Sequence, residues 1–351
     1  MEQLNQLGWT SYTEQKWQEV AEPGLVPARV IADFGTSLRI ATPAVVTAEL
    51  SGKLAHYTPS EFTPKVGDWV GVRLSENSAA VIDILVPRRS EITRKAAGKQ
   101  TIKQVMAANV DIAFVVLALD NDFSIARLER FLYQLSINHI EPVIVLNKVD
   151  MTNGASPYIA ELQSLKLPIV VSSAINGTGT DEILSHIAPG RTAILLGSSG
   201  VGKSTLTNRL LQREAQKTKA VRSSDGTGQH TTVHRELFVL PNGGLLIDMP
   251  GIRELQLWGT EKELAENFDD ISRLIAQCKY TTCSHNGEEG CAIQKALHDG
   301  SLSASHFANY IKMRSELKDL HQKNIVQLRR DNKRSRKTLK QQAEDMRRDD
   351  W

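Results

Sequence analysis

A glycine-rich stretch near the middle of the chain constrains the fold more than any other part of the sequence. Residues 192–205 read TAILLGSSGVGKST, in which four apolar or small residues precede a match to G-x-x-x-x-G-K-S that begins at Gly197. Leucines follow at helical spacing. A strand, a glycine-rich turn and a helix in this order form a phosphate-binding loop, because the N–H groups of the turn and the helix N-terminus attract anions. The sequence therefore predicts a polyphosphate site.

Two side chains of this stretch have specific expected roles. Lys203 would lie against the outer phosphates, and Ser204 would place its hydroxyl on Mg²⁺. The loop as a whole would supply the other contacts, from Gly197, Ser198, Ser199, Gly200, Val201, Gly202 and Thr205. An ordinary Gly/Ser turn before a helix is the alternative interpretation.

Length and composition set the limits for the rest of the chain. Its 351 residues suggest two or three domains. The N-terminus is polar and lacks the apolar core of a signal peptide, and no stretch approaches the roughly 18 apolar residues of a membrane span. All three cysteines are clustered, which favours a reducing compartment and a metal over a disulfide framework. We expect a cytoplasmic protein without a membrane contact.

The N-terminal part has the pattern of a small barrel. Residues 1–23 are expected to form an arm, either poorly ordered or with a short helix. Residues 24–90 contain about five short β segments separated by Gly, Pro, Asn and Asp, as in barrels of the OB or SH3 kind. OB barrels often bind single-stranded nucleic acid, and a basic face could come from Arg29, Arg39, Lys53, Lys65 and Arg73. A barrel that only spaces or docks other parts is the alternative.

Residues 91–108 are expected to be a basic connector. The sequence around its first half is rich in Lys and Arg. Such a charge run is typical of a solvated linker, and the alternative is a hinge that contacts phosphates.

The pattern changes to alternating strands and helices over residues 109–260. Val110–Leu119 is a nearly continuous apolar run, as expected for a strand buried on both faces. A second predicted strand ends in Asn147-Lys148-Val149-Asp150, which matches the guanine-reading N-K-x-D element of GTPases. The carboxylate of Asp150 can accept from the ring N–H and the 2-amino group of guanine, which adenine cannot match. Asn147 can tie its loop to neighbouring loops, and the stem of Lys148 can cover the base.

Three further segments fit a nucleotide site by their positions. Ser173 and Ala174, after the next strand, resemble the GTPase element whose backbone N–H meets the guanine O6. Residues 223–232 are polar and glycine-rich, as a switch loop should be, and Thr231 or Thr232 is placed to coordinate Mg²⁺ and sense the γ-phosphate. A flexible surface connection is the alternative for that loop.

The third segment is a D-x-x-G element directly after an apolar strand. Asp248 would reach Mg²⁺, and the N–H of Gly251 would bind the γ-phosphate.

The order of these elements is the informative part. NKVD (147–150) and SSA (172–174) precede the phosphate loop (197–204), the threonine pair and DMPG (248–251), whereas in ordinary Ras-like GTPases the phosphate loop comes first. At this point the sequence resembles the circularly permuted GTPases, and specifically the ribosome small-subunit-dependent GTPase A family of bacterial ribosome-assembly factors. The resemblance covers nearly the whole chain. It implies a slow GTPase that is stimulated by the small ribosomal subunit, contacts its rRNA and acts late in its maturation.

The residue after D-x-x-G bears on the expected rate. It is Ile252, where many GTPases have a glutamine that orients the attacking water. Hydrolysis should therefore be slow until another group supplies this function. His230, beside the switch threonines, is the local candidate and resembles the G-x-H-T-T neighbourhood of the family; a loop histidine that only packs is the alternative. The expected catalytic residues are His230, Lys203 and Thr232.

Residues 261–322 are expected to form a zinc-binding and helical domain. Cys278, Cys283, His285 and Cys291 have the spacing C-x₄-C-x-H-x₅-C. Three thiolates and one imidazole form a closed ligand set suited to one structural Zn²⁺. His298 and His306 are the fallback ligands, and incidental cysteines near a histidine are the alternative. The spacing also resembles the zinc element of the family.

The C-terminal residues 323–351 form a basic tail. From Lys323 to Arg348 there are ten Lys or Arg residues and three acidic ones. Such an excess of positive charge is typical of a contact with RNA phosphates, and a tail that only aids solubility is the alternative.

The sequence thus predicts a multidomain chain: an N-terminal OB-like β-barrel, a central circularly permuted Ras-like α/β GTPase domain and a C-terminal zinc-binding and helical domain. We expect a monomeric, Mg²⁺-dependent GTPase that converts GTP to GDP and phosphate on the small ribosomal subunit. An RNA-binding assembly scaffold that uses GTP only as a binding switch is one alternative. A signalling or membrane-associated GTPase is another, against which the barrel, the cysteine cluster and the basic tail argue.

Overall fold

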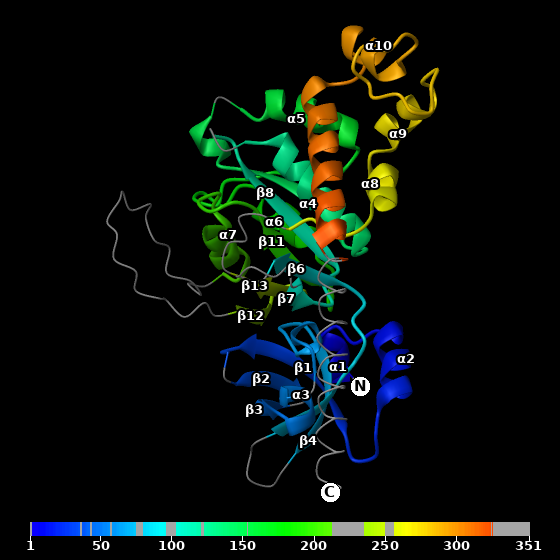
Figure 1. Ribbon diagram of the computed structural model, residues 1–351. Coiled ribbons are helices and arrows are strands. Elements are labelled where there is room, and N and C mark those ends of the chain that lie inside the picture. Colours follow the sequence, from blue (N-terminus) through cyan, green and yellow to red (C-terminus); the bar gives the residue numbers. More distant parts are fainter. Residues whose placement is uncertain are drawn as a thin grey trace, which may run out of the picture. The chain divides into compact units, whose positions relative to one another are not determined.

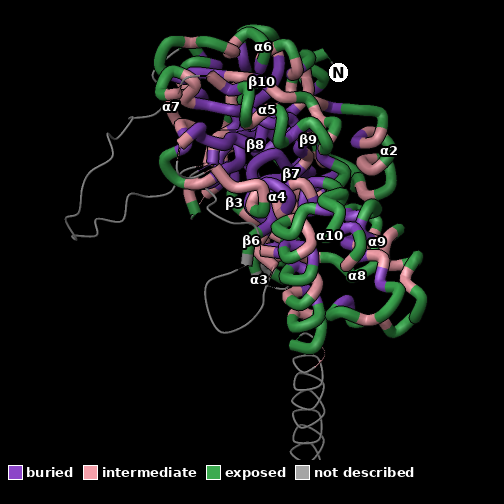
Figure 2. The backbone as a smooth tube through the Cα atoms, turned by 90° about the horizontal axis from the view of Figure 1, so that it is seen from above, coloured by how far each residue is buried: buried purple, intermediate pink, exposed green. Residues whose placement is uncertain are grey.

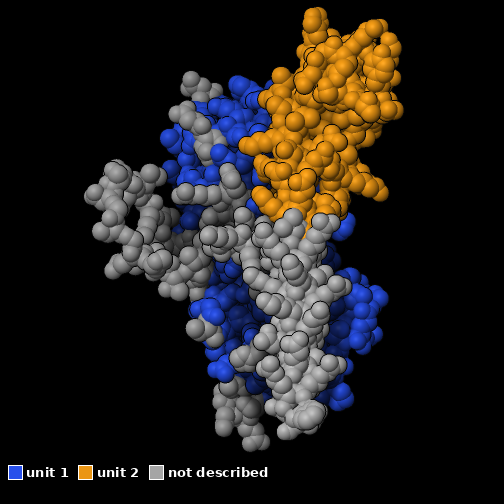
Figure 3. Space-filling view, in the orientation of Figure 1, with its two compact units in different colours: residues 1–95, 103–256 blue, residues 96–102, 257–351 orange. Residues whose placement is uncertain are grey.

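The structure is a computed structural model. It describes residues 2–35, 37–42, 44–56, 58–74, 80–95, 103–120, 123–152, 154–212, 235–249, 256–323 and 325. The chain forms two compact units (Figure 3). Unit 1 comprises residues 1–95 and 103–256, and unit 2 comprises residues 96–102 and 257–351.

The N-terminal part of unit 1 is the closed barrel that the sequence predicts. Its strands are β1 (Val26–Asp33), β2 (Leu38–Thr42), β3 (Ala44–Leu50), β4 (Trp69–Leu74) and β5 (Ala80–Leu85). They pair in the order β1-β2-β3-β5-β4, and β4 pairs again with β1 to close the barrel. The short helices α3 (Gly52–His56) and η1 (Ser60–Phe62) connect β3 to β4. Alternating residues such as Val30, Ile40 and Ile82 fill the interior, as in the five-stranded barrels of the OB kind.

The N-terminal arm is folded against this barrel. It contains α1 (Glu2–Gln6) and α2 (Ser11–Val20), and Thr10 caps α2 by accepting a hydrogen bond from the Thr13 N–H. The ring of Trp9 meets the ring of Trp69 edge to face, with centroids 4.7 Å apart. Burial of these two large side chains explains why the arm is ordered.

The segment expected to be a basic connector instead contains a β-hairpin. β6 (Glu91–Lys95) and β7 (Lys103–Ala108) pair in an antiparallel two-stranded sheet. The apolar end of β7, with Met106 and Ala107, lies in the same hydrophobic core as the central sheet. The Lys and Arg residues at the start of the stretch led to the prediction of a connector, although the apolar residues at its end form a buried strand face.

The rest of unit 1 is an α/β domain around a mostly parallel sheet (Figure 1). Its strands are β8 (Ile112–Ala118), β9 (Glu141–Asn147), β10 (Ile169–Val171), β11 (Thr192–Leu196), β12 (Arg235–Val239) and β13 (Leu245–Asp248). The spatial order is β10-β9-β8-β11-β13-β12, and only β12 is antiparallel to its neighbour in this group. The phosphate-loop strand β11 therefore lies between a strand that precedes it and one that follows it in the chain.

Helices cover both faces of this sheet, because its strands are apolar on both sides. Val115 and Leu117 of β8 pack with α4 (Ile125–Ile137) and α5 (Ser156–Leu162). Phe114 and Val116 of the same strand pack with α6 (Thr180–Ser185) and α7 (Lys203–Leu210) on the other face. Figure 2 shows β8 as buried, and β9 is buried from Val143 to Asn147. Two 3₁₀ turns, η2 (Val149–Met151) and η3 (Gln163–Leu165), complete the connections.

The barrel and the α/β domain share one sheet within unit 1. β1 pairs with β12, with Ala32 opposite Glu236 and Asp33 opposite Arg235. Arg29 of the same strand is almost fully buried and donates to the Thr192 hydroxyl at the start of β11. Its burial lowers the pKa of the guanidinium to about 10.

Unit 2 is a small helical body. α8 (Glu261–Asn267) begins with a capping box formed by Thr260 and Glu263, and α9 (Asp269–Ala276) follows it at once. The sequence pattern of residues 261–277 predicts one continuous helix, but the structure has two. Phe268, between them, has non-helical dihedral angles and is buried, with its ring stacked on that of His306 at a centroid distance of 5.1 Å. α10 (Ala292–His298) and a helix over residues 304–323 complete the unit.

Candidate functional site

The phosphate loop has the backbone geometry that its sequence predicts. It connects β11 to α7, and Gly197 and Gly202 both have positive φ angles, of 143° and 99°. A Cβ atom at Gly197 would lie 2.4 Å from the carbonyl oxygen of Val116, and one at Gly202 would lie 2.3 Å from the amide nitrogen of Asn147. Glycine is therefore required at both positions by dihedral angle and by space.

Lys203, the first residue of α7, contacts the backbone of this loop. The ammonium group of Lys203 reaches back across the loop and donates to the carbonyl of Gly197 at 2.7 Å, and also to that of Ser198. Ser204 and Thr205 follow in the first helical turn, and Val201 is buried beneath the loop. Ser199 and Gly200 form a turn in the loop between β11 and α7.

Asn147 joins three of the loops that the sequence assigns to the nucleotide. Its side-chain nitrogen donates to the carbonyl of Val201 in the phosphate loop at 2.7 Å. Its side-chain oxygen accepts from the Ser172 hydroxyl at 3.1 Å and from the Ala174 N–H at 3.0 Å. The side chain is buried, so these hydrogen bonds are shielded from water and fix the loops against each other.

The other two residues of the N-K-x-D element differ in exposure. Lys148 has a left-handed backbone, with φ of 67°, and its ammonium donates to Asp120 at 2.8 Å just beyond the end of β8. Asp150 lies in η2 and is exposed at the surface of the loop. Ser173 is buried and forms an isolated bridge with Thr178. The chain thus places an exposed carboxylate beside an ordered, buried loop.

Asp248 lies at the same end of the sheet as the phosphate loop. It is the last residue of β13, which runs parallel to β11 with Ile247 opposite Ile194. The carboxyl ends of parallel strands share one edge of a sheet, where ligands of α/β folds bind. His230, Thr231, Thr232 and Gly251, also assigned to this site from the sequence, lie outside the described residues.

Two arginines that the sequence analysis did not single out contact these loops. Arg127, in the first turn of α4, donates to the Ser198 hydroxyl at 3.1 Å. Arg209, in the last turn of α7, donates to the carbonyl of Ala174 at 3.1 Å and also to that of Ile175. Neither position carries a motif, because each arginine contacts a loop that is distant in the sequence.

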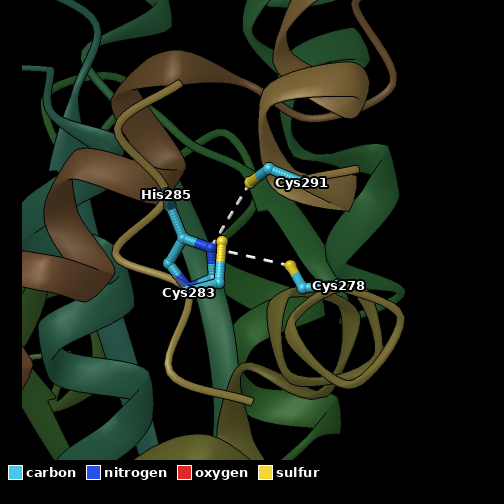
Figure 4. A group of neighbouring side chains, drawn as sticks. All are labelled: Cys278, Cys283, His285 and Cys291. Carbon is cyan, nitrogen blue, oxygen red and sulfur yellow. Dashed lines mark hydrogen bonds between the residues drawn. The ribbon is translucent and has the colours of Figure 1, made fainter. Parts of the chain in front are cut away.

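The second site is a cluster of four side chains in unit 2 (Figure 4). The sulfur atoms of Cys278, Cys283 and Cys291 and a ring nitrogen of His285 all lie within 4.8 Å of one another. The Nδ1 atom of His285 is 3.7 Å from the Cys278 sulfur and 3.5 Å from the Cys291 sulfur. Around a tetrahedral zinc ion the donor atoms are roughly 3.5–3.8 Å apart, given metal–ligand bonds of about 2.0–2.3 Å. The cluster therefore has the dimensions and the donor types of a metal site.

Local structure holds these ligands in place. Cys278 follows the end of α9, and Cys291 caps α10, with its sulfur accepting from the Gln294 N–H at 3.5 Å. His285 has a left-handed backbone, with φ of 62°, and its carbonyl accepts from the Gln294 side chain. Of the fallback ligands, His306 pairs with Asp270 at 3.0 Å instead, and the cluster found among the described residues includes neither it nor His298.

The thiols of this cluster differ in how easily they ionise. Desolvation raises the pKa of Cys283 to about 11, and the two neighbouring thiols add to the effect. At Cys278 desolvation is opposed and outweighed by hydrogen bonds from the N–H groups of Ala292 and Ile293, so its pKa lies below the usual value. A divalent cation would stabilise all three thiolates at once, and its binding would release protons.

Among the parts of the chain that the structure describes, we find no helix of the length and apolar character that a membrane crossing requires.

Comparison with known proteins identifies the family of the chain. Residues 85–258 match the family model described as RsgA GTPase. A small ribosomal subunit biogenesis GTPase RsgA from Syntrophotalea carbinolica is 39% identical over 99% of this chain and 98% of its own length. The protein of the same name from Xanthomonas axonopodis pv. citri is 41% identical over 94% of this chain and 93% of its own length.

Solved structures show the same fold. The crystal structure of YjeQ from Thermotoga maritima has a TM-score of 0.61 and 26% identity, and the match covers 84% of this chain and 98% of that one. The crystal structure of YloQ, a circularly permuted GTPase, has a TM-score of 0.59 and 23% identity over 86% of this chain and 98% of that one. The permuted order of the nucleotide elements, the Ras-like sheet and the full-length similarity lead to one conclusion: the chain belongs to the RsgA GTPase family.

Proposed function

We propose that this protein is a Mg²⁺-dependent GTPase that acts in the biogenesis of the small ribosomal subunit and hydrolyses GTP while bound to that particle. The observation that carries the proposal is the junction at Asn147, where the phosphate loop, the N-K-x-D loop and the Ser-Ser-Ala loop are held together. The names of the full-length relatives supply the biological setting.

The chemistry assigned to the site is positioning and charge stabilisation. The loop N–H groups from Gly197 to Thr205 and the ammonium of Lys203 would hold the phosphates. Ser204, Asp248 and the switch threonines Thr231 and Thr232 would hold Mg²⁺, which neutralises charge on the phosphate oxygens when bound. Asn147, Lys148, Asp150, Ser173 and Ala174 would read the guanine, and the N–H of Gly251 would contact the γ-phosphate.

The proposed group next to the attacking water is His230. Ile252 cannot orient water by hydrogen bonding, so the histidine beside the switch threonines is assigned that role. His230→Ala should lower subunit-stimulated turnover by about 100-fold or more, the usual range for a positioned acid–base group, while GTP affinity changes little. Single-turnover hydrolysis and a binding titration on the same preparation check this, and equal turnover removes His230 from the mechanism.

Three further assignments complete the proposal. The Cys₃His cluster is assigned one structural Zn²⁺, because a closed set of three thiolates and an imidazole is a donor set that this ion prefers and leaves no position for water. The barrel and the basic residues 323–351 are assigned contacts with rRNA phosphates. The protein is expected to act as a monomer in the cytoplasm.

A scaffold that uses GTP only as a binding switch is the second candidate, and Ile252 after the D-x-x-G element favours it. The deciding experiment is GTP hydrolysis by the full chain with and without saturating small subunits. Stimulation by the particle supports the enzyme, and a rate equal to that of the free protein supports the scaffold. Co-sedimentation that weakens as salt rises would support phosphate contacts in either case.

A further inference from the structure

Arg209 contacts the loop that is assigned to the guanine base, although it belongs to the phosphate-loop helix. It lies in the last turn of α7, and its guanidinium donates to two consecutive carbonyl oxygens, those of Ala174 and Ile175. The Ala174 contact measures 3.1 Å. The planar fork of an arginine can hold two acceptors in fixed directions, which a lysine cannot do.

These contacts determine where the neighbouring N–H groups point. In a trans peptide the carbonyl and the N–H of one plane point in opposite directions. The carbonyl of Ala174 shares its plane with the N–H of Ile175, so Arg209 sets the direction of that N–H. The carbonyl of Ile175 shares its plane with the N–H of Asn176, which donates to the Ser173 hydroxyl at 3.4 Å.

Asn147 and Arg209 hold different parts of this loop. Asn147 holds the side before the turn, through the Ser172 hydroxyl and the Ala174 N–H. Beyond that point the chain leaves the core, and the side chain of Ile175 is 68% exposed. Among the described residues, Arg209 donates to both carbonyl oxygens of this outer part, those of Ala174 and Ile175.

We propose that Arg209 is a positioning residue for base selectivity: by holding the Ala174 carbonyl it orients the backbone N–H of Ile175, at the end of the Ser-Ser-Ala loop, toward the guanine O6. The inference rests on the proposed GTP site. Arg209 connects α7, the helix that begins at the phosphate loop, with the loop that contacts the base. One side chain would therefore couple phosphate binding to base recognition.

The test compares nucleotides that differ in single groups of the base. 6-Thio-GDP replaces the O6 acceptor with a weakly accepting sulfur, whereas IDP lacks only the 2-amino group that Asp150 would read. Arg209→Ala should weaken GDP binding about five- to tenfold, as expected for an exposed charge-assisted contact. The preference for GDP over 6-thio-GDP should shrink toward one, while the preference for GDP over IDP stays as in the unchanged chain.

Two variants serve as controls, measured with the full chain by calorimetry or fluorescence titration. Arg209→Lys keeps the positive charge but loses the planar guanidinium. Its GDP affinity and its preference for GDP over 6-thio-GDP should lie between those of the unchanged chain and those of the alanine variant. Arg191→Ala removes another exposed arginine, whose 2.7 Å pair with Glu141 lies at the opposite end of the strands, and should leave both preferences unaltered.

The outcomes separate the inference from the function on which it rests. If the unchanged chain binds GDP no better than ADP, the proposed guanine site fails. If the unchanged chain is selective but Arg209→Ala keeps the preference over 6-thio-GDP, the inference alone is overturned. A parallel loss of both preferences also overturns it, because it would show general loosening of the site and no selective effect on O6.

Discussion

The two candidate sites of this protein are held by opposite means. The nucleotide loops extend from strands whose side chains are almost fully buried, and a single buried asparagine fastens them to each other. The metal cluster lies among short helices and turns, where two of its four ligands, Cys278 and Cys283, are only half-buried. We therefore expect the core of the α/β domain to position the first site before a ligand binds, and the second site to depend on a bound metal ion for much of its stability.

The largest expected effect comes from removing a metal ligand. Cys283→Ser should lower bound zinc well below one ion per chain and make unit 2 sensitive to proteases. Structural zinc contributes about 10–16 kcal/mol to binding-coupled folding in small domains, which exceeds what a small helical body can supply otherwise. Elemental analysis and limited proteolysis measure the two effects.

The neighbouring variant Thr282→Ser is the matched control and should keep the metal. GDP affinity of Cys283→Ser should equal that of the unchanged chain, because the nucleotide loops belong to unit 1. Full zinc occupancy in Cys283→Ser would refute the ligand assignment.

The corresponding variant in the nucleotide site is Asn147→Ala. It leaves the Val201 carbonyl and the Ala174 N–H without their present partner, and each buried group left unsatisfied costs about 1–3 kcal/mol. We expect GDP affinity to fall roughly 100-fold while zinc content stays unchanged. Asn138→Ala removes a side-chain hydrogen bond at the end of α4 and is the control; a loss of less than threefold for Asn147→Ala would contradict the junction model.

A smaller and more selective effect is expected at Asp150. Asp150→Asn replaces a carboxylate, which would accept hydrogen bonds from guanine, with an amide. The NH₂ group of the amide can donate to the additional oxygen of xanthine. GDP should bind about tenfold or more weakly and xanthosine diphosphate correspondingly better, as hydrogen-bonding sites discriminate strongly between such analogues. Glu161→Gln, an exposed acid on α5, should change neither. Unchanged base preference would refute the guanine assignment.

The smallest effect concerns the frame of the metal site and not its ligands. Thr260→Ala removes the side chain that accepts from the Glu263 N–H at the start of α8. Loss of such a cap costs about 1 kcal/mol, so unit 2 should unfold at a slightly lower denaturant concentration while it keeps its metal. Amide hydrogen exchange of α8 follows the change, Thr260→Ser should restore the cap, and loss of zinc in Thr260→Ala would show that the cap and the cluster are coupled.

Motifs with fixed spacing could be predicted from the sequence, and contacts between distant segments could not. The phosphate loop and the N-K-x-D element lie at strand ends because each follows an apolar run that becomes a buried strand. The metal ligands are also local, all within fourteen residues. The contacts of Arg127 and Arg209 could not be predicted because their partners lie in loops that are distant in the sequence.

The same distinction explains the differences in the fold. The order of the central sheet depends on strand pairing between segments that are distant in the sequence, which local patterns do not determine. The arm packs on the barrel through the contact of the Trp9 ring with the Trp69 ring, and these residues are sixty positions apart in the sequence. Phe268 breaks a periodic helical pattern because burial of its ring against His306 outweighs helix continuity.

The pairing of β1 with β12 has a consequence for how the protein can be divided. A chain cut after the barrel would leave β12 as an exposed edge strand, with unpaired N–H and C=O groups where β1 now lies. The Thr192 hydroxyl at the start of β11 would also lose its partner Arg29. We therefore expect the barrel and the nucleotide domain to unfold as one cooperative unit although they are two folds by topology, and an isolated nucleotide domain should aggregate through the exposed edge of its own sheet.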